Sequence, residues 1–122
     1  MKFYIEKNTA VEDVKKVFTD YYPYLKIEFY KTMDNERIAP LKREALPSNF
    51  ILNKLLKDSD NTIINLDKNI TVAELENQFA NIGLNAEIFR KSGSAFIGTS
   101  LTDNWTLQQQ NAEAEELDLH FN

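Results

Sequence analysis

The chain has 122 residues, a formal net charge of −5, and hydrophobic side chains at 43 % of its positions. This length and apolar content fit a single domain, residues 1–122, with a sizeable core, and they exclude a disordered chain. The chain has no cysteine, which excludes disulfides, thiol nucleophiles and thiolate metal sites. The negative balance offers no clustered positive field for nucleic acid or an anionic membrane.

The start of the chain lacks the apolar segment of a signal peptide, because Glu6, Lys7 and Asn8 interrupt it. No stretch approaches the roughly 20 apolar residues that a membrane-spanning helix needs. We therefore expect a cytoplasmic protein with no membrane partner.

Residues 1–33 have the pattern of a β-α-β unit. Residues 2–7 alternate, with Phe3 and Ile5 on one face, as in a half-buried strand. Thr9 and Glu12 have the spacing of a capping box at a helix start. Helical spacing then places four residues on one stripe: Val11, Val14, Phe18 and Tyr21. After Pro23, residues 25–33 form a second predicted strand with Ile27 and Phe29 on one face.

Residues 34–61 are interpreted as a segment inserted between two units. After Pro47, apolar residues at helical spacing predict a short helix that ends near Asp58.

Residues 62–91 repeat the β-α-β pattern. Residues 62–67 alternate as a strand, and Thr71 with Glu74 forms a second capping box. The helical stripe recurs as Val72, Leu75, Phe79 and Ile82. Residues 84–101 then read as a hairpin that turns at residues 92–94. The remainder, residues 95–122, holds an extra strand and a C-terminal helical segment over residues 105–119.

The two units align residue by residue. Phe3 corresponds to Ile64, and Phe18 corresponds to Phe79. After two residues are removed at the Tyr-rich corner of the first unit, Glu28 corresponds to Glu87 and Tyr30 to Phe89. The corresponding residues are similarly apolar or polar throughout.

This repeat predicts an α+β protein, a two-layer sandwich of the ferredoxin-like β-α-β-β-α-β type, with an extra strand and a C-terminal helix. Its four unit strands would form one antiparallel sheet with both helices on one face. Phe18 and Phe79 would lie at the centre of the core.

One sheet face would then carry Tyr4, Tyr30 and Phe89 as an apolar patch. Exposed patches of this kind mark contact surfaces. RNA-binding sheets also display aromatic residues, but here three carboxylates, Glu6, Glu28 and Glu87, would repel phosphate. Two interpretations remain open. The C-terminal segment that contains Trp105 covers the patch, or the patch binds a protein partner or a second copy of the chain.

The sequence contains no recognisable catalytic set, metal site or cofactor motif. His120 is the only histidine and lies near the end of the chain, so no internal imidazole is available as a general base. Its spacing from Glu116 provides only two potential ligands.

The sequence therefore predicts a non-catalytic protein-interaction or regulatory module that self-associates through a sheet face. The interaction candidates are Tyr4, Tyr30, Phe89 and Trp105. One alternative is a small-ligand-binding domain with a pocket between the sheet and the C-terminal helix. An enzyme is the least favoured alternative.

Overall fold

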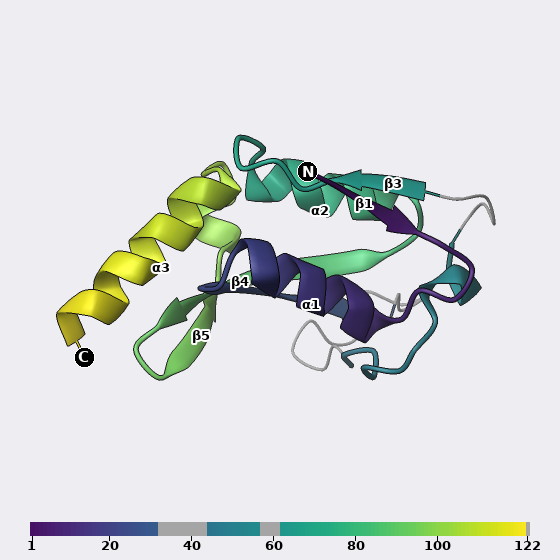
Figure 1. Cartoon of the computed structure of the whole chain (residues 1–122), viewed down its shortest axis with the longest axis horizontal. Coiled ribbons are helices and arrows are strands. Elements are labelled where there is room, and N and C mark those ends of the chain that lie inside the picture. Colours follow the sequence, from purple (N-terminus) through teal and green to yellow (C-terminus); the bar gives the residue numbers. More distant parts are fainter. Residues whose placement is uncertain (32–43, 57–61, 122) are drawn as a thin grey trace.

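A computed structural model describes residues 1–31, 44–56 and 62–121 of the chain. The elements in chain order are β1 (Lys2–Ile5), α1 (Val11–Tyr21), β2 (Leu25–Tyr30), η1 (Leu52–Lys54), β3 (Thr62–Asn65), α2 (Val72–Asn81), β4 (Asn85–Ser92), β5 (Ala95–Gly98), η2 (Ser100–Thr102) and α3 (Leu107–Phe121) (Figure 1). Both η elements are single 3₁₀ turns. Within the described residues, the short helix predicted after Pro47 is reduced to η1. Its predicted end near Asp58 lies outside the described residues.

The described strands form two antiparallel sheets, β1–β3 and β2–β4–β5. Together with the helices they form an α+β sandwich. The ferredoxin-like arrangement is not confirmed, because the four strands that it places in one sheet are divided into two pairs. Helix α1 packs on β2, and α2 packs on β4 and β3. The two sheets and two helices share one hydrophobic cluster.

Corresponding strands of the two units pair with each other. Phe3 lies directly opposite Ile64 in the β1–β3 ladder, and Glu28 lies directly opposite Glu87 in the β2–β4 ladder. In both pairs each residue faces its own counterpart from the sequence repeat. An antiparallel ladder centred on such a pair has a local two-fold axis, so the chain repeat has become an approximate symmetry of the fold.

The repeat extends beyond the β-α-β units, into segments that follow each second strand. The Leu46 amide donates to the Phe29 carbonyl at 2.7 Å, and the Thr99 amide donates to the Ile88 carbonyl at 3.3 Å. Phe29 and Ile88 correspond in the repeat. Residues 44–46 therefore lie along β2 as residues 97–99 lie along β4.

These segments next satisfy the free N–H groups at the start of each helix. The Phe50 carbonyl accepts from Val11 at 2.9 Å, and the Trp105 carbonyl accepts from the corresponding Val72 at 3.0 Å. The bridge Ala10–Ile51 likewise matches the bridge Thr71–Thr106. Two structural repeats result: the first comprises the described residues up to 56, and the second comprises residues 62–121.

The predicted core is present. Phe18 and Phe79 are fully buried, and the Phe79 ring packs edge-on against Phe29 with their centroids 5.1 Å apart. The alternation in the predicted strands places eight residues on the core face. Phe3 is half-buried, and the other seven are buried: Ile5, Ile27, Phe29, Ile64, Leu66, Ala86 and Ile88.

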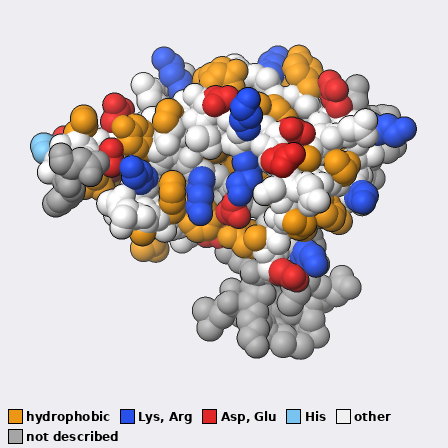
Figure 2. Space-filling view, turned by 60° about the horizontal axis from the view of Figure 1, so that its bottom comes forward, with side chains coloured by type: hydrophobic (Ala, Val, Ile, Leu, Met, Phe, Trp, Pro, Cys, Tyr) orange, Lys and Arg blue, Asp and Glu red, His pale blue; other side chains and the backbone are white. Residues whose placement is uncertain are grey.

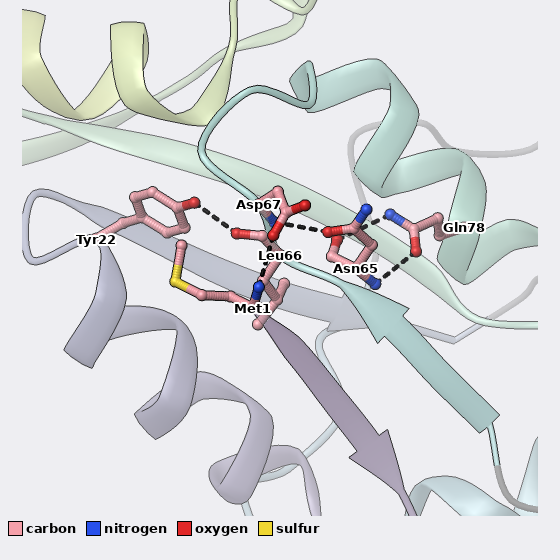
Figure 3. Close-up of polar contacts among 6 residues, drawn as sticks. All are labelled: Met1, Tyr22, Asn65, Leu66, Asp67 and Gln78. Carbon is pink, nitrogen blue, oxygen red and sulfur yellow. Dashed lines mark hydrogen bonds and ion pairs between the residues drawn. The ribbon is translucent and has the colours of Figure 1, made fainter.

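One residue of the first helical stripe is corrected by the structure. Tyr21 is 44 % exposed, and its neighbour Tyr22 is buried at 4 % exposure. Tyr22 follows Phe18 by four residues, which keeps it on the core face, and its hydroxyl donates to the Leu66 carbonyl at 2.6 Å (Figure 3). Burial, together with the charges of Asp67 and Tyr21, raises the pKa of Tyr22 to about 12.

Polar contacts tie the end of β3 to its neighbours (Figure 3). The ammonium group of Met1 pairs with the Asp67 carboxylate at 2.6 Å. This hydrogen bond lowers the pKa of Asp67. The Asn65 backbone exchanges two hydrogen bonds with the Gln78 side chain, at 2.8 and 2.9 Å. These contacts fix α2 and the start of β1 on β3.

The predicted capping box of Thr9 and Glu12 is wrong. Helix α1 begins one residue later than that box requires, with Ala10 at the N-cap. Asp13 accepts from the Ala10 amide at 2.8 Å, and the Thr9 hydroxyl accepts from the Glu6 amide instead.

Candidate interaction surface

The structure divides the predicted aromatic patch between the two sheets. Tyr4 lies on β1, directly opposite Ile63 of β3, and both side chains are 53 % exposed. Tyr30 and Phe89 belong to the other sheet. The three aromatic residues therefore do not form one sheet face.

Tyr30 and Phe89 share the face of the β2–β4–β5 sheet that points away from the core, and both are half-buried. Phe89 pairs with Lys26, and Tyr30 pairs with Asn85. The Glu28–Glu87 pair lies between them in the ladder. Glu28 forms an ion pair with Lys15 of α1. The two aromatic residues are thus separated by carboxylates.

Trp105 lies in the turn before α3 and is half-buried. The Arg90 guanidinium carbon lies 5.4 Å from the centre of its ring, within range of a cation–π contact. Because its carbonyl also accepts from Val72, Trp105 anchors the start of α3 to both β4 and α2.

A buried polar cluster fixes α3 beside this tryptophan. Gln110 is fully buried and accepts from the Arg90 guanidinium at 2.9 Å. Its amide nitrogen donates to the Thr102 carbonyl at 2.7 Å and to the Thr102 hydroxyl at 2.8 Å. The Nε atom of Arg90 is buried without a hydrogen-bond partner among the described residues. Sequence reasoning missed Gln110, because three successive glutamines gave no sign of which one faces inward.

Helix α3 covers one end of the β2–β4–β5 sheet. Asn111 accepts from the Tyr24 amide at 2.9 Å, and Asp118 pairs with Lys91 at 3.0 Å. Tyr24 and Lys91 lie next to each other where β2 begins and β4 ends. Tyr4 remains exposed, so α3 does not cover the whole predicted patch.

The most exposed strand in the described residues is β5, which the sequence predicted as a strand but not as an interaction surface. All four residues of β5 are exposed, including Phe96 at 41 % and Ile97 at 40 %. Figure 1 shows the β4–β5 hairpin projecting from the body of the molecule, on the side away from β1 and β3. Gly93, with φ of 63°, occupies the first turn position, where a left-handed conformation favours glycine.

The sequence does contain a sign that this strand could pair with another chain. Residues 92–101 contain no charged residue and no proline. Exposed edge strands normally carry such residues because they prevent pairing with another chain.

The hairpin enlarges the aromatic part of the sheet face. The Lys26 ammonium lies 5.3 Å from the centre of the Phe89 ring and 4.8 Å from the centre of the Phe96 ring. One cation therefore bridges an aromatic residue that the sequence proposed and one that it missed. Figure 2 shows basic, acidic and apolar side chains interspersed over the visible face, without a large field of one sign.

A groove of about 560 Å³ lies between α2 and β4. The Glu76 carboxylate at this groove accepts from the Ile88 amide at 3.3 Å. The groove does not lie between the sheet and the C-terminal helix, where the sequence predicted a pocket. Small-molecule binding therefore stays a prediction.

The described residues contain no group of three or more His, Asp or Glu side chains that could hold a metal. The His120 ring lies 3.8 Å from Glu116 at the exposed end of α3. No helix in the described ranges is long and apolar enough to cross a membrane.

Comparison of the chain with protein-family models, curated proteins and solved structures found no match.

Proposed function

We propose that the protein is a non-catalytic interaction module that self-associates through the β2–β4–β5 sheet. The observation that carries this proposal is the β4–β5 hairpin, whose outer strand is exposed, uncharged and apolar on both faces. The sequence predicted self-association through the face with Tyr4, Tyr30 and Phe89. We propose that the contact lies toward the edge of the β2–β4–β5 sheet, at Phe96 and Ile97.

The two segments that flank the β2–β4 pair differ. Residues 44–46 lie beside β2 through a single bridge, Tyr30–Ala45, and Leu46 is buried against the core. Strand β5 pairs with β4 over four exposed residues, and no described residue pairs with its other side. An open edge offers a row of unpaired N–H and C=O groups, and charge, proline or a covering segment usually protects it. Here an added strand would supply the missing partner.

The charge distribution favours a protein partner over nucleic acid. Phosphate binding requires clustered cations. On this sheet Lys91 is paired with Asp118, and Lys26 lies over two aromatic rings. The exposed apolar residues of the hairpin instead favour contact with another apolar protein surface.

Light scattering at increasing protein concentration tests the proposal. We expect the mass of the wild-type protein to rise from that of a monomer toward that of a dimer. The double variant Phe96→Ser, Ile97→Ser should stay monomeric at the same concentrations. Leu119→Ser is the matched control, because Leu119 is an exposed apolar residue on α3, at 72 % exposure. A wild-type protein that stays monomeric up to millimolar concentration would contradict self-association.

A further inference from the structure

The β4–β5 ladder determines which backbone groups of β5 point outward. The Thr99 amide and hydroxyl both donate to the Ile88 carbonyl, at 3.3 and 2.8 Å. Hydrogen-bonded pairs recur at every second residue of an antiparallel ladder. Ile97 and Ala95 are therefore the next residues of β5 whose backbone groups bond to β4.

Phe96 and Gly98 lie between these bonded residues. Their N–H and C=O groups consequently point toward the open edge of the sheet. Ser94 lies in the hairpin turn, outside β5. Its carbonyl also points toward the open edge, because the N–H group of the same trans peptide, that of Ala95, points toward β4.

Symmetry restricts how a second copy can pair with this edge. Residues directly opposite each other in an antiparallel ladder have side chains on the same face. Two identical strands related by a two-fold axis must therefore be centred on one residue, not between two. Centring on Phe96 places Phe96 opposite Phe96 of the other copy, whereas centring on Ile97 places each Phe96 opposite Gly98. Only the Phe96 centre therefore brings the two aromatic rings directly opposite each other, because glycine has no side chain to contact the ring.

The side chains also fit a second copy of the chain. With Phe96 at the centre, the two Phe96 rings meet on the outer face, and Ala95 lies opposite Ile97 on the other face. Residues 92–101 carry no charge, so no like charges meet across the ladder. A charged peptide would find no complementary charge on this strand. These features favour self-pairing over capture of a charged segment.

We infer that two copies of the chain join by antiparallel pairing of β5 with β5, centred on Phe96, so that two β2–β4–β5 sheets become one continuous sheet. This inference rests on the proposed self-association and specifies its geometry. One short strand buries much less than the roughly 800 Å² per partner of a standard stable interface. The dimer is therefore weak and depends on protein concentration.

Cysteine cross-linking tests the register, because the natural chain has no cysteine. Phe96→Cys should form a disulfide-linked dimer, since hydrogen-bonded pairs lie about 5.5 Å apart at Cα, within the range for disulfides. Ala95→Cys mixed with Ile97→Cys should cross-link more than either variant alone. Lys16→Cys, exposed on α1, is the control for random collision. Cross-linking of Ile97→Cys to itself as efficiently as Phe96→Cys would overturn the Phe96-centred register.

A proline scan separates this geometry from self-association in general. Phe96→Pro removes an N–H group that points outward and leaves the β4–β5 bonds intact, whereas Phe96→Ala removes the ring alone. Loss of the central hydrogen bonds should weaken dimerisation by about tenfold beyond the effect of Phe96→Ala. Circular dichroism checks that both variants fold.

The two proposals fail in different ways. If the wild-type protein dimerises and Phe96→Pro dimerises as well as Phe96→Ala, strand pairing is overturned and self-association stands. If the wild-type protein shows no dimer by light scattering and Phe96→Cys cross-links no faster than Lys16→Cys, both proposals are overturned.

Discussion

The two structural repeats share a backbone pattern and differ in how they end. In the first repeat, the segment after β2 passes through residues 44–46 and ends in the 3₁₀ turn η1. In the second, the chain first makes the exposed β4–β5 hairpin and ends in the 15-residue helix α3. In each, a carbonyl of that segment accepts from the first residue of the helix in its own repeat.

The two repeats therefore share main-chain bonds and differ in side chains and in the elements that follow. Hydrogen bonds between main-chain groups do not depend on side-chain identity, so one bonding pattern tolerates two different sequences. Leu46 fills the core at the place where Thr99 hydrogen-bonds to the strand beside it. The flanking segment of the first repeat thus makes a single bridge and buries a leucine, whereas that of the second is an exposed four-residue strand followed by a helix over one sheet end.

The largest expected effect tests whether the two repeats contribute equally to the core. Phe18→Ala and Phe79→Ala each remove a fully buried ring at corresponding positions. We expect each to lower the free energy of unfolding by about 3–5 kcal/mol, measured by urea denaturation. Phe96→Ala is the control and should change stability little, because Phe96 is exposed on β5. A buried-ring variant as stable as wild type would contradict the shared core.

A smaller effect should be confined to the second repeat. Gln110→Ala leaves the buried Arg90 and Thr102 groups without their partner, which should cost about 1–3 kcal/mol. Unfolding can be followed by the emission of Trp105, the only tryptophan. Gln108→Ala is the matched control, since Gln108 is exposed on the same helix. Equal stability of the two variants would show that the cluster does not fix α3.

The smallest expected change in stability concerns the first residues of the two helices. The capping box predicted in the second repeat is confirmed: the Thr71 hydroxyl accepts from the Glu74 amide at 3.1 Å. Thr71→Ala should therefore cost about 1 kcal/mol in thermal or urea unfolding, and Thr71→Ser should retain most of the cap. Thr9→Ala should cost less, because the Thr9 hydroxyl bonds outside α1. A larger loss for Thr9→Ala would reverse the difference between the two helix starts.

The candidate site was less predictable than the fold elements. Tyr30 and Phe89 do share a sheet face, because alternation along a strand is a local property. Tyr4 does not lie on that face, because β1 pairs with β3 in a separate sheet. Phe96 lies on the same face as Phe89, because β5 pairs with β4 in the hairpin. Which aromatic residues meet is therefore decided by strand pairing, which joins residues far apart in the sequence.

The sequence by itself determined the positions of α1, α2 and most strands, the repeat, and nearly all of the core face. Each of these follows from the spacing of apolar residues over one or two turns or strands. Only the tertiary structure decided that corresponding strands pair with each other in two sheets, and that β5 stays at an open edge. Strand partners and register depend on side chains that meet only after folding, so periodicity along the chain does not specify them.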